Sequence, residues 1–170
     1  MTMKFLGAVA LTALLAACSN TPPATTGAST GAGAGTTITT TPGVGPGSQE
    51  DLATNVGDKV FFAFNQSSLT SDAQATLDRQ AEWLQKYQQV QVQVAGNTDD
   101  RGTEEYNLAL GQRRTNAARD YLVARGASSA RINTISFGKD RPIALGDNEQ
   151  SWAQNRNAIT SVQNANVSMR

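Results

Sequence analysis

The sequence predicts an α/β fold, a two-layer sandwich of order β-α-β-α-β-β with helices on one face of a mixed sheet, over residues 51–165. Three observations support this prediction. The apolar and aromatic run KVFFAF at 59–64 indicates a strand. The segment from Gln89 to Val94 alternates strictly between glutamine and valine, and two longer segments carry apolar residues at helical spacing. A strand with one polar face indicates that helices cover a single side of the sheet.

The first strand and the first helix follow from a change of spacing near Leu69. The strand over 59–64 is expected to be buried, because nearly all of its residues are apolar. The following segment repeats apolar residues every three or four positions, which predicts an amphipathic helix. These positions are Leu69, Ala73, Leu77, Ala81 and Leu84. Thr70 is a suitable N-cap, and Asp72 lies in the favourable first turn.

The second helix is expected to follow the loop 97–102. Thr103 can cap it, and Glu104 and Glu105 fall in its first turn, where carboxylates are favoured. Gly126 is a suitable residue to end it. Three short elements complete the order, namely a strand over 131–138, a helical turn over 149–156 and a final strand over 157–162.

Composition excludes several classes of site. The chain has no histidine, which excludes catalytic triads and zinc sites built on imidazole. Its single cysteine excludes an internal disulfide. With 14 basic and 14 acidic residues the net charge is zero, which argues against a nucleic-acid binder. No cofactor and no metal are expected.

The pattern of the N-terminal 50 residues predicts export of the chain and a lipid anchor. Residues 1–17 have a short positive start at Lys4 and an apolar run too short to span a bilayer, as in a signal peptide. The run ends in Leu-Ala-Ala-Cys at 15–18, which resembles the bacterial lipobox and predicts a covalent lipid on Cys18. A buried apolar cysteine or an ordinary cleavage site is the less favoured alternative. In Gram-negative lipoproteins an Asp after the lipidated cysteine tends to retain the protein at the inner membrane. Because Ser19 stands there in this chain, the resemblance implies the outer membrane. Residues 18–50 are expected to form a lipidated flexible tether, and residues 166–170 a tail.

One charge pair stands out at the entry to the second helix. Asn107 and Arg114 are seven positions apart and lie within ~20° on the helix surface, on the side of Leu110. Asp99 follows the alternating strand, and Gly102 can make the turn into the helix. A fixed anion and a fixed cation there would suit an amino-acid group. Alternatively, Asp99 binds loop amides and Arg114 pairs with Glu105 or Asp99, and the pattern alone favours this structural interpretation.

The remaining polar and aromatic residues have structural interpretations. Asp100 is expected to be a turn residue, and Glu104 and Glu105 to serve the helix end. Trp83 and Trp152 are expected to pack rather than to bind a ligand. A carboxylate-based hydrolase using Asp99 and Asp100 is disfavoured, because neighbours on an extended loop point apart.

The run GNTDDRGTEEYNLALGQRRTNAARDYL at 96–122 resembles the OmpA-like peptidoglycan-binding domain, and the resemblance covers about 56–162. With the lipobox and tether, the chain resembles the peptidoglycan-associated lipoproteins, or Pal proteins, of Gram-negative envelopes. The resemblance reverses the preference for the structural interpretation. It implies non-covalent binding of peptidoglycan through the diaminopimelate of the stem peptide, a Tol-Pal role in envelope integrity and cell division, and TolB as a second partner. The residues implied in peptidoglycan binding are Asp99, Arg114, Thr98, Asn107, Asn65, Phe64 and Leu110.

The chain departs from the family pattern at three positions. Many relatives have Asp at the place of Asn65 and His at the place of Asn97, and the run 155–157 is one arginine short at Asn157. These departures leave the Asp99 and Arg114 pair intact, so they bear on affinity and on partner contacts. A scaffold that acts mainly through protein partners remains an alternative.

Overall fold

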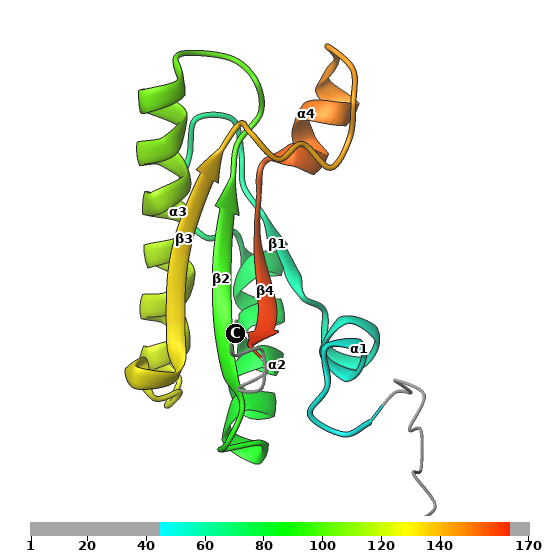
Figure 1. Ribbon diagram of the computed structural model, residues 1–170, viewed down its shortest axis with the longest axis vertical. Coiled ribbons are helices and arrows are strands. Elements are labelled where there is room, and N and C mark those ends of the chain that lie inside the picture. Colours follow the sequence, from blue (N-terminus) through cyan, green and yellow to red (C-terminus); the bar gives the residue numbers. More distant parts are fainter. Residues whose placement is uncertain (1–44, 164–170) are drawn as a thin grey trace, which may run out of the picture. The chain divides into compact units, whose positions relative to one another are not determined.

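A computed structural model describes residues 45–163, which form a four-stranded sheet with helices packed against it (Figure 1). The predicted signal peptide, Cys18 and nearly all of the predicted tether lie outside the described residues, as does the tail. The elements, in chain order, are α1 (Gln49–Asp51), a π-helical turn η1 (Leu52–Val56), β1 (Lys59–Phe61), α2 (Ser71–Lys86), β2 (Gln91–Asn97), α3 (Glu104–Ala124), a 3-10 turn η2 (Ser129–Arg131), β3 (Ile132–Gly138), α4 (Glu149–Asn155) and β4 (Asn157–Gln163). No helix within this range is long and apolar enough to cross a bilayer.

The sheet is mixed, with strand order β1-β4-β2-β3. Strand β2 is parallel to β3, and β4 is antiparallel to both β1 and β2. The carboxyl ends of β1, β2 and β3 and the start of β4 therefore lie at the same end of the strands, which is at the top of Figure 1. The predicted fold class is confirmed.

The core lies between the sheet and helices α2 and α3. Val92 and Val94 of β2 are fully buried, whereas Gln91 is exposed, as the alternating sequence predicts. Leu77 and Leu84 of α2 and Leu122 of α3 are also buried completely. Burial of each such side chain contributes roughly 1.5–3 kcal/mol. This packing fixes α3 against the sheet and with it the side chains at its first turns.

The first strand differs from its prediction. It ends at Phe61 instead of residue 64 and lies at the edge of the sheet, where Phe61 is 49% exposed. The prediction of a buried strand is wrong for this residue, because helices cover only one face. Beyond Phe62 the chain turns, with the Gln66 amide donating to the Ala63 carbonyl and Asn65 at φ 56°. This turn brings the loop after β1 towards α3.

Other element boundaries also shift. Strand β2 begins two residues later than predicted and extends to Asn97, so that Thr98 and Asp99 follow its end directly. Helix α1 begins at Gln49, within the range assigned to the tether, and neither α1 nor η1 was predicted. The Asp51 carboxylate ties this segment to α2 by accepting a hydrogen bond from the Trp83 indole at 2.8 Å.

The predicted helix ends are confirmed. The Thr70 hydroxyl accepts from the Ala73 amide, and the Thr103 hydroxyl accepts from the Tyr106 amide, each at 3.2 Å. Gly126 has φ 96°, in the left-handed region that favours glycine after a helix. The start of α3 is therefore specified locally, next to the loop that carries Asp99.

Candidate functional site

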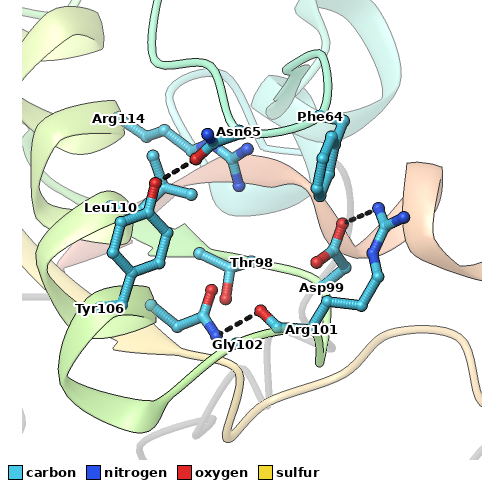
Figure 2. Close-up of a pocket in the computed structure, with 10 residues that line it drawn as sticks. Phe64, Asn65, Thr98, Asp99, Arg101, Gly102, Tyr106, Leu110 and Arg114 are labelled. Atoms are coloured by element: carbon cyan, nitrogen blue, oxygen red, sulfur yellow. Dashed lines mark hydrogen bonds and ion pairs between the residues drawn. The ribbon is translucent and has the colours of Figure 1, made fainter.

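A pocket of about 200 Å³ opens where β1 and β2 end and α3 begins (Figure 2). Its walls come from the loop after β1, the loop 98–102 and the first three turns of α3. The lining residues are Phe64, Asn65, Thr98, Asp99, Arg101, Gly102, Tyr106, Asn107, Leu110 and Arg114. All seven residues predicted to bind peptidoglycan therefore lie in one pocket. Sequence reasoning did not assign a binding role to Arg101, Gly102 or Tyr106.

Arg114 is completely buried and forms one wall of this pocket. Its guanidinium donates to three backbone carbonyls, those of Asn97 at 2.8 Å, Gln66 at 2.9 Å and Ala63 at 3.3 Å. The expected alternative, a pair with Glu105 or Asp99, is wrong, since no ion pair joins Arg114 to a carboxylate within the described residues. Burial lowers the pKa of Arg114 to about 10, against a smaller opposing effect of the Asp99 charge. Two of its five N–H donors have no acceptor in the described part of the chain.

Asp99 lies in the same pocket and is 4% exposed. Its Oδ2 accepts from Arg101 at 2.6 Å and from Arg156 at 3.4 Å. Burial raises the pKa of Asp99, but the hydrogen bond and charge of Arg101, helped by Arg156 and a backbone amide, hold it below its ordinary value. Asp99 therefore bonds a loop amide, as the structural interpretation expects, and also pairs with two arginines that this interpretation did not include. Asp99 is an anion at neutral pH, with two cations as neighbours.

The loop between these two groups is held by Asn107. Its side-chain amide donates to the carbonyls of Arg101 at 2.9 Å and Thr103 at 3.0 Å. Gly102 has φ 95°, which confirms the predicted turn into the helix. Asn107 thus acts on the pocket by fixing the loop backbone.

The opposite rim joins the loop after β1 to α3. The Tyr106 hydroxyl donates to Asn65 Oδ1 across the pocket (Figure 2). Asn65 has the described chain's only positive φ outside glycine, a conformation that Asn and Asp tolerate better than most residues. Deeper in the pocket, the Thr98 hydroxyl is buried without a partner in the described residues. An unpaired buried hydroxyl beside a cavity is available to a ligand.

Arg101 closes the side of the pocket near Phe64. Its guanidinium carbon lies 4.0 Å from the ring centre of Phe64 and 4.0 Å from that of Trp152. Trp152, expected to be a packing residue, therefore packs on a charged side chain of this site. Arg156 is the one arginine of the run 155–157. It donates to the Phe62 carbonyl and to Glu149 as well as to Asp99. In the sequence, only its position two residues after Asp99 could have indicated that Arg101 lies in this pocket.

The other predicted residues keep structural positions. Trp83 is buried against α1, Asp100 is exposed, and Glu104 and Glu105 lie exposed in the first turn of α3. Asn97 is buried and donates to Asn157 at 2.8 Å behind the pocket. Between residues 45 and 163, no three Asp, Glu, His or Cys side chains are grouped so that they could hold a metal ion.

Comparison with known proteins places this chain in a family. Residues 61–156 match the OmpA family. The chain is 52% identical over 120 residues to the peptidoglycan-associated lipoprotein of Mesorhizobium japonicum, covering 71% of each chain. It is 55% identical over 115 residues to that of Rhizobium meliloti, covering 68% of this chain and 65% of the relative.

Solved structures agree with the sequence comparison. The crystal structure of the peptidoglycan-associated lipoprotein from Burkholderia pseudomallei is 44% identical, with a TM-score of 0.61, and the match covers 62% of this chain and 90% of that one. The C-terminal domain of Helicobacter pylori MotB has a TM-score of 0.59 at 22% identity, which shows a shared fold alone. With a family match over more than half of its length and relatives at about 50% identity, this chain belongs to the OmpA family.

Proposed function

We propose that this protein is an outer-membrane lipoprotein that binds peptidoglycan non-covalently and so ties the outer membrane to the cell wall. Its relatives at about 50% identity are named peptidoglycan-associated lipoproteins. The chemical target within the wall is the side chain of diaminopimelate, which carries an ammonium and a carboxylate. Asp99 receives the ammonium, and Arg114 receives the carboxylate.

The observation that carries this proposal is the state of Arg114. This guanidinium is fully buried and has no carboxylate partner among residues 45–163, so it has lost its hydration, and its backbone acceptors only partly compensate for that loss. Its two remaining donors suit a ligand carboxylate, which binds arginine more strongly than a neutral acceptor does. Asp99 supplies the opposite charge in the same 200 Å³ pocket. A zwitterionic side chain satisfies both groups together.

The chain is a binding protein and not an enzyme, like the family to which it belongs. Hydrolysis of a glycosidic bond needs two carboxylates that face each other across the bond. Asp99 is ion-paired in the pocket, whereas Asp100 is exposed and lies outside its lining. This arrangement gives the hydrolase alternative no support.

The anchor and the protein partners complete the proposal. A lipid on Cys18 would hold the domain at the periplasmic face of the outer membrane, with the segment between Cys18 and α1 as its tether. The lipobox and the lipoprotein names of the relatives support this placement. TolB, within a Tol-Pal system that serves envelope integrity and cell division, is the proposed protein partner, and that role rests on the sequence resemblance.

Co-sedimentation with purified diaminopimelate-type peptidoglycan tests the proposed function. The chain from Ser19 to Arg170 contains the whole described domain and is expected to pellet with the wall. Asp99→Asn keeps the shape but removes the charge for the ligand ammonium, so it should remain in the supernatant. Asp78→Asn is the matched control, because Asp78 pairs with Arg125 on the helices away from the pocket. Wall binding by Asp99→Asn equal to that of the control would refute the assignment.

A TolB binding assay on the same variants separates the two partners. Retention of TolB by Asp99→Asn would show that wall binding and partner binding use different side chains. Loss of both, with an unchanged melting temperature, would show that the two surfaces overlap.

A further inference from the structure

Arg101 has an arrangement that the proposed function does not use. Its guanidinium lies between the rings of Phe64 and Trp152, 4.0 Å from each ring centre. A cation between two aromatic faces is held by electrostatic attraction to both. The carbonyl of Arg101 accepts from Asn107, so its backbone is fixed, and its side chain lies along the side of the pocket near Phe64. Figure 2 shows the guanidinium beside the Asp99 carboxylate, next to the Phe64 ring.

This guanidinium is paired with Asp99, the same carboxylate that a ligand ammonium would need. Arg101 Nη2 lies 2.6 Å from Asp99 Oδ2, the shortest ion pair of the pocket. Arg156 reaches the same oxygen at 3.4 Å and is itself anchored on the Phe62 carbonyl. A second cation at Asp99 must therefore compete with Arg101, which is the less constrained of the two and has a side chain 33% exposed.

A second acceptor for Arg101 lies close by. Glu149 Oε2 is 4.0 Å from Arg101 Nη2, while Glu149 Oε1 holds Arg156 at 2.6 Å. The Nε of Arg101 is buried and has no acceptor in the described residues, so its present position leaves one donor unpaired. A small movement along the two rings would exchange Asp99 for Glu149 without loss of the stacking.

We propose that Arg101 determines ligand specificity at this pocket by acting as the resident counter-ion of Asp99, which only a ligand ammonium displaces. The displaced guanidinium stays between Phe64 and Trp152 and pairs with Glu149. This inference rests on the proposed function and deepens it. A ligand with a carboxylate but no ammonium leaves Arg101 on Asp99 and gains contacts with Arg114 alone.

Calorimetric titration with two synthetic peptides tests the inference. One is muramyl tripeptide ending in meso-diaminopimelate, whose side-chain ammonium is its only cation. The other is the same peptide with that ammonium replaced by hydrogen. Arg101→Gln removes the competing cation. We therefore expect the first peptide to bind this variant about two- to fivefold more tightly than it binds wild type, which is the effect of losing a partly exposed ion pair. Affinity for the second peptide should not rise.

Arg125→Gln is the matched control, because Arg125 is also ion-paired, with Asp78 at 2.9 Å, but lies outside the pocket. It should leave both affinities unchanged. Weaker binding of the diaminopimelate peptide by Arg101→Gln would overturn the inference, since Arg101 would then grip the ligand itself. A failure of wild type to bind that peptide would instead refute the proposed function.

A crystal structure of wild type with the diaminopimelate peptide gives a second test that does not depend on a variant folding. The inference expects Arg101 to lie beyond 4.0 Å from Asp99 and within ion-pair distance of Glu149. An Arg101–Asp99 pair that remains intact in the complex would overturn it.

Discussion

Selection between two wall chemistries follows from the burial of Arg114. Some peptidoglycans carry lysine in place of diaminopimelate, which removes one carboxylate and keeps the ammonium. The lysine side chain can still reach Asp99, but nothing in it can accept from Arg114. Because Arg114 is 0% exposed, water cannot fully replace the missing acceptor. We expect lysine-type stem peptide to bind much more weakly than diaminopimelate-type peptide.

The size of this difference follows from the donors of Arg114. Three of its five N–H groups are used by the carbonyls of Ala63, Gln66 and Asn97. A hydrogen bond to a charged group contributes about 1.5–3 kcal/mol. Loss of one such bond corresponds to about 10- to 140-fold in the dissociation constant, and loss of both remaining bonds to more.

Calorimetric titration of the chain from Ser19 to Arg170 with one muramyl tripeptide ending in diaminopimelate and one ending in lysine measures this ratio. The comparison changes the ligand and leaves the protein intact, so a folding defect cannot imitate the result. Dissociation constants within threefold of each other would refute the reasoning. They would show that Arg114 has no contact with the ligand and serves the fold alone.

Three further changes separate stability from binding. Arg114→Ala should lower the free energy of unfolding by about 3 kcal/mol or more in urea denaturation, because three carbonyls lose a charged donor; an unchanged midpoint would contradict this. Thr98→Val should leave the melting temperature unchanged or higher, since it removes a buried hydroxyl that has no partner in the described part of the chain, but it should weaken peptide binding; equal affinity would exclude a ligand contact there. Hydrogen bonds from the Gly47 amide, Asn55 and Trp83 lower the pKa of Asp51 from 3.8 to about 2. Its stabilisation is therefore complete above about pH 5 and is lost as pH falls towards 2, so wild type and Asp51→Asn should differ in urea midpoint at pH 7 and converge near pH 2.

The fold was predictable because its signals are local. Alternation in β2 and the apolar spacing of α2 each depend on nearby residues, and the caps Thr70 and Thr103 act within one turn. The end of β2 depends on distant contacts. At Gly96 an added Cβ would collide with the Gly111 carbonyl and lie 2.8 Å from Thr115 Cγ2. Glycine there serves the close approach of α3 to the sheet, which no local pattern reveals.

The grouping of the site residues at one pocket was predictable, but their hydrogen bonding was not. The helix period placed Asn107 and Arg114 on one line, and the pocket confirms that both face it. Two of the three acceptors of Arg114 are backbone carbonyls some 50 positions away, and a carbonyl has no residue type by which a sequence could identify it. Arg101 was missed for a related reason, since its second ring, Trp152, lies 51 positions further along the chain.

The charges around the pocket give selectivity a second origin. Three guanidinium groups, those of Arg101, Arg114 and Arg156, surround two carboxylates, those of Asp99 and Glu149, which leaves one positive charge in excess. A lysine side chain would raise this excess to two, whereas the side chain of diaminopimelate adds none. Glu149 is 65% exposed, so salt screens its part of this field, with a Debye length of about 8 Å at physiological ionic strength. The two Arg114 donors that have no acceptor between residues 45 and 163 are buried and escape such screening. Discrimination between the two walls should thus persist at high salt, carried by the hydrogen bonds of Arg114 after the excess charge has lost its effect.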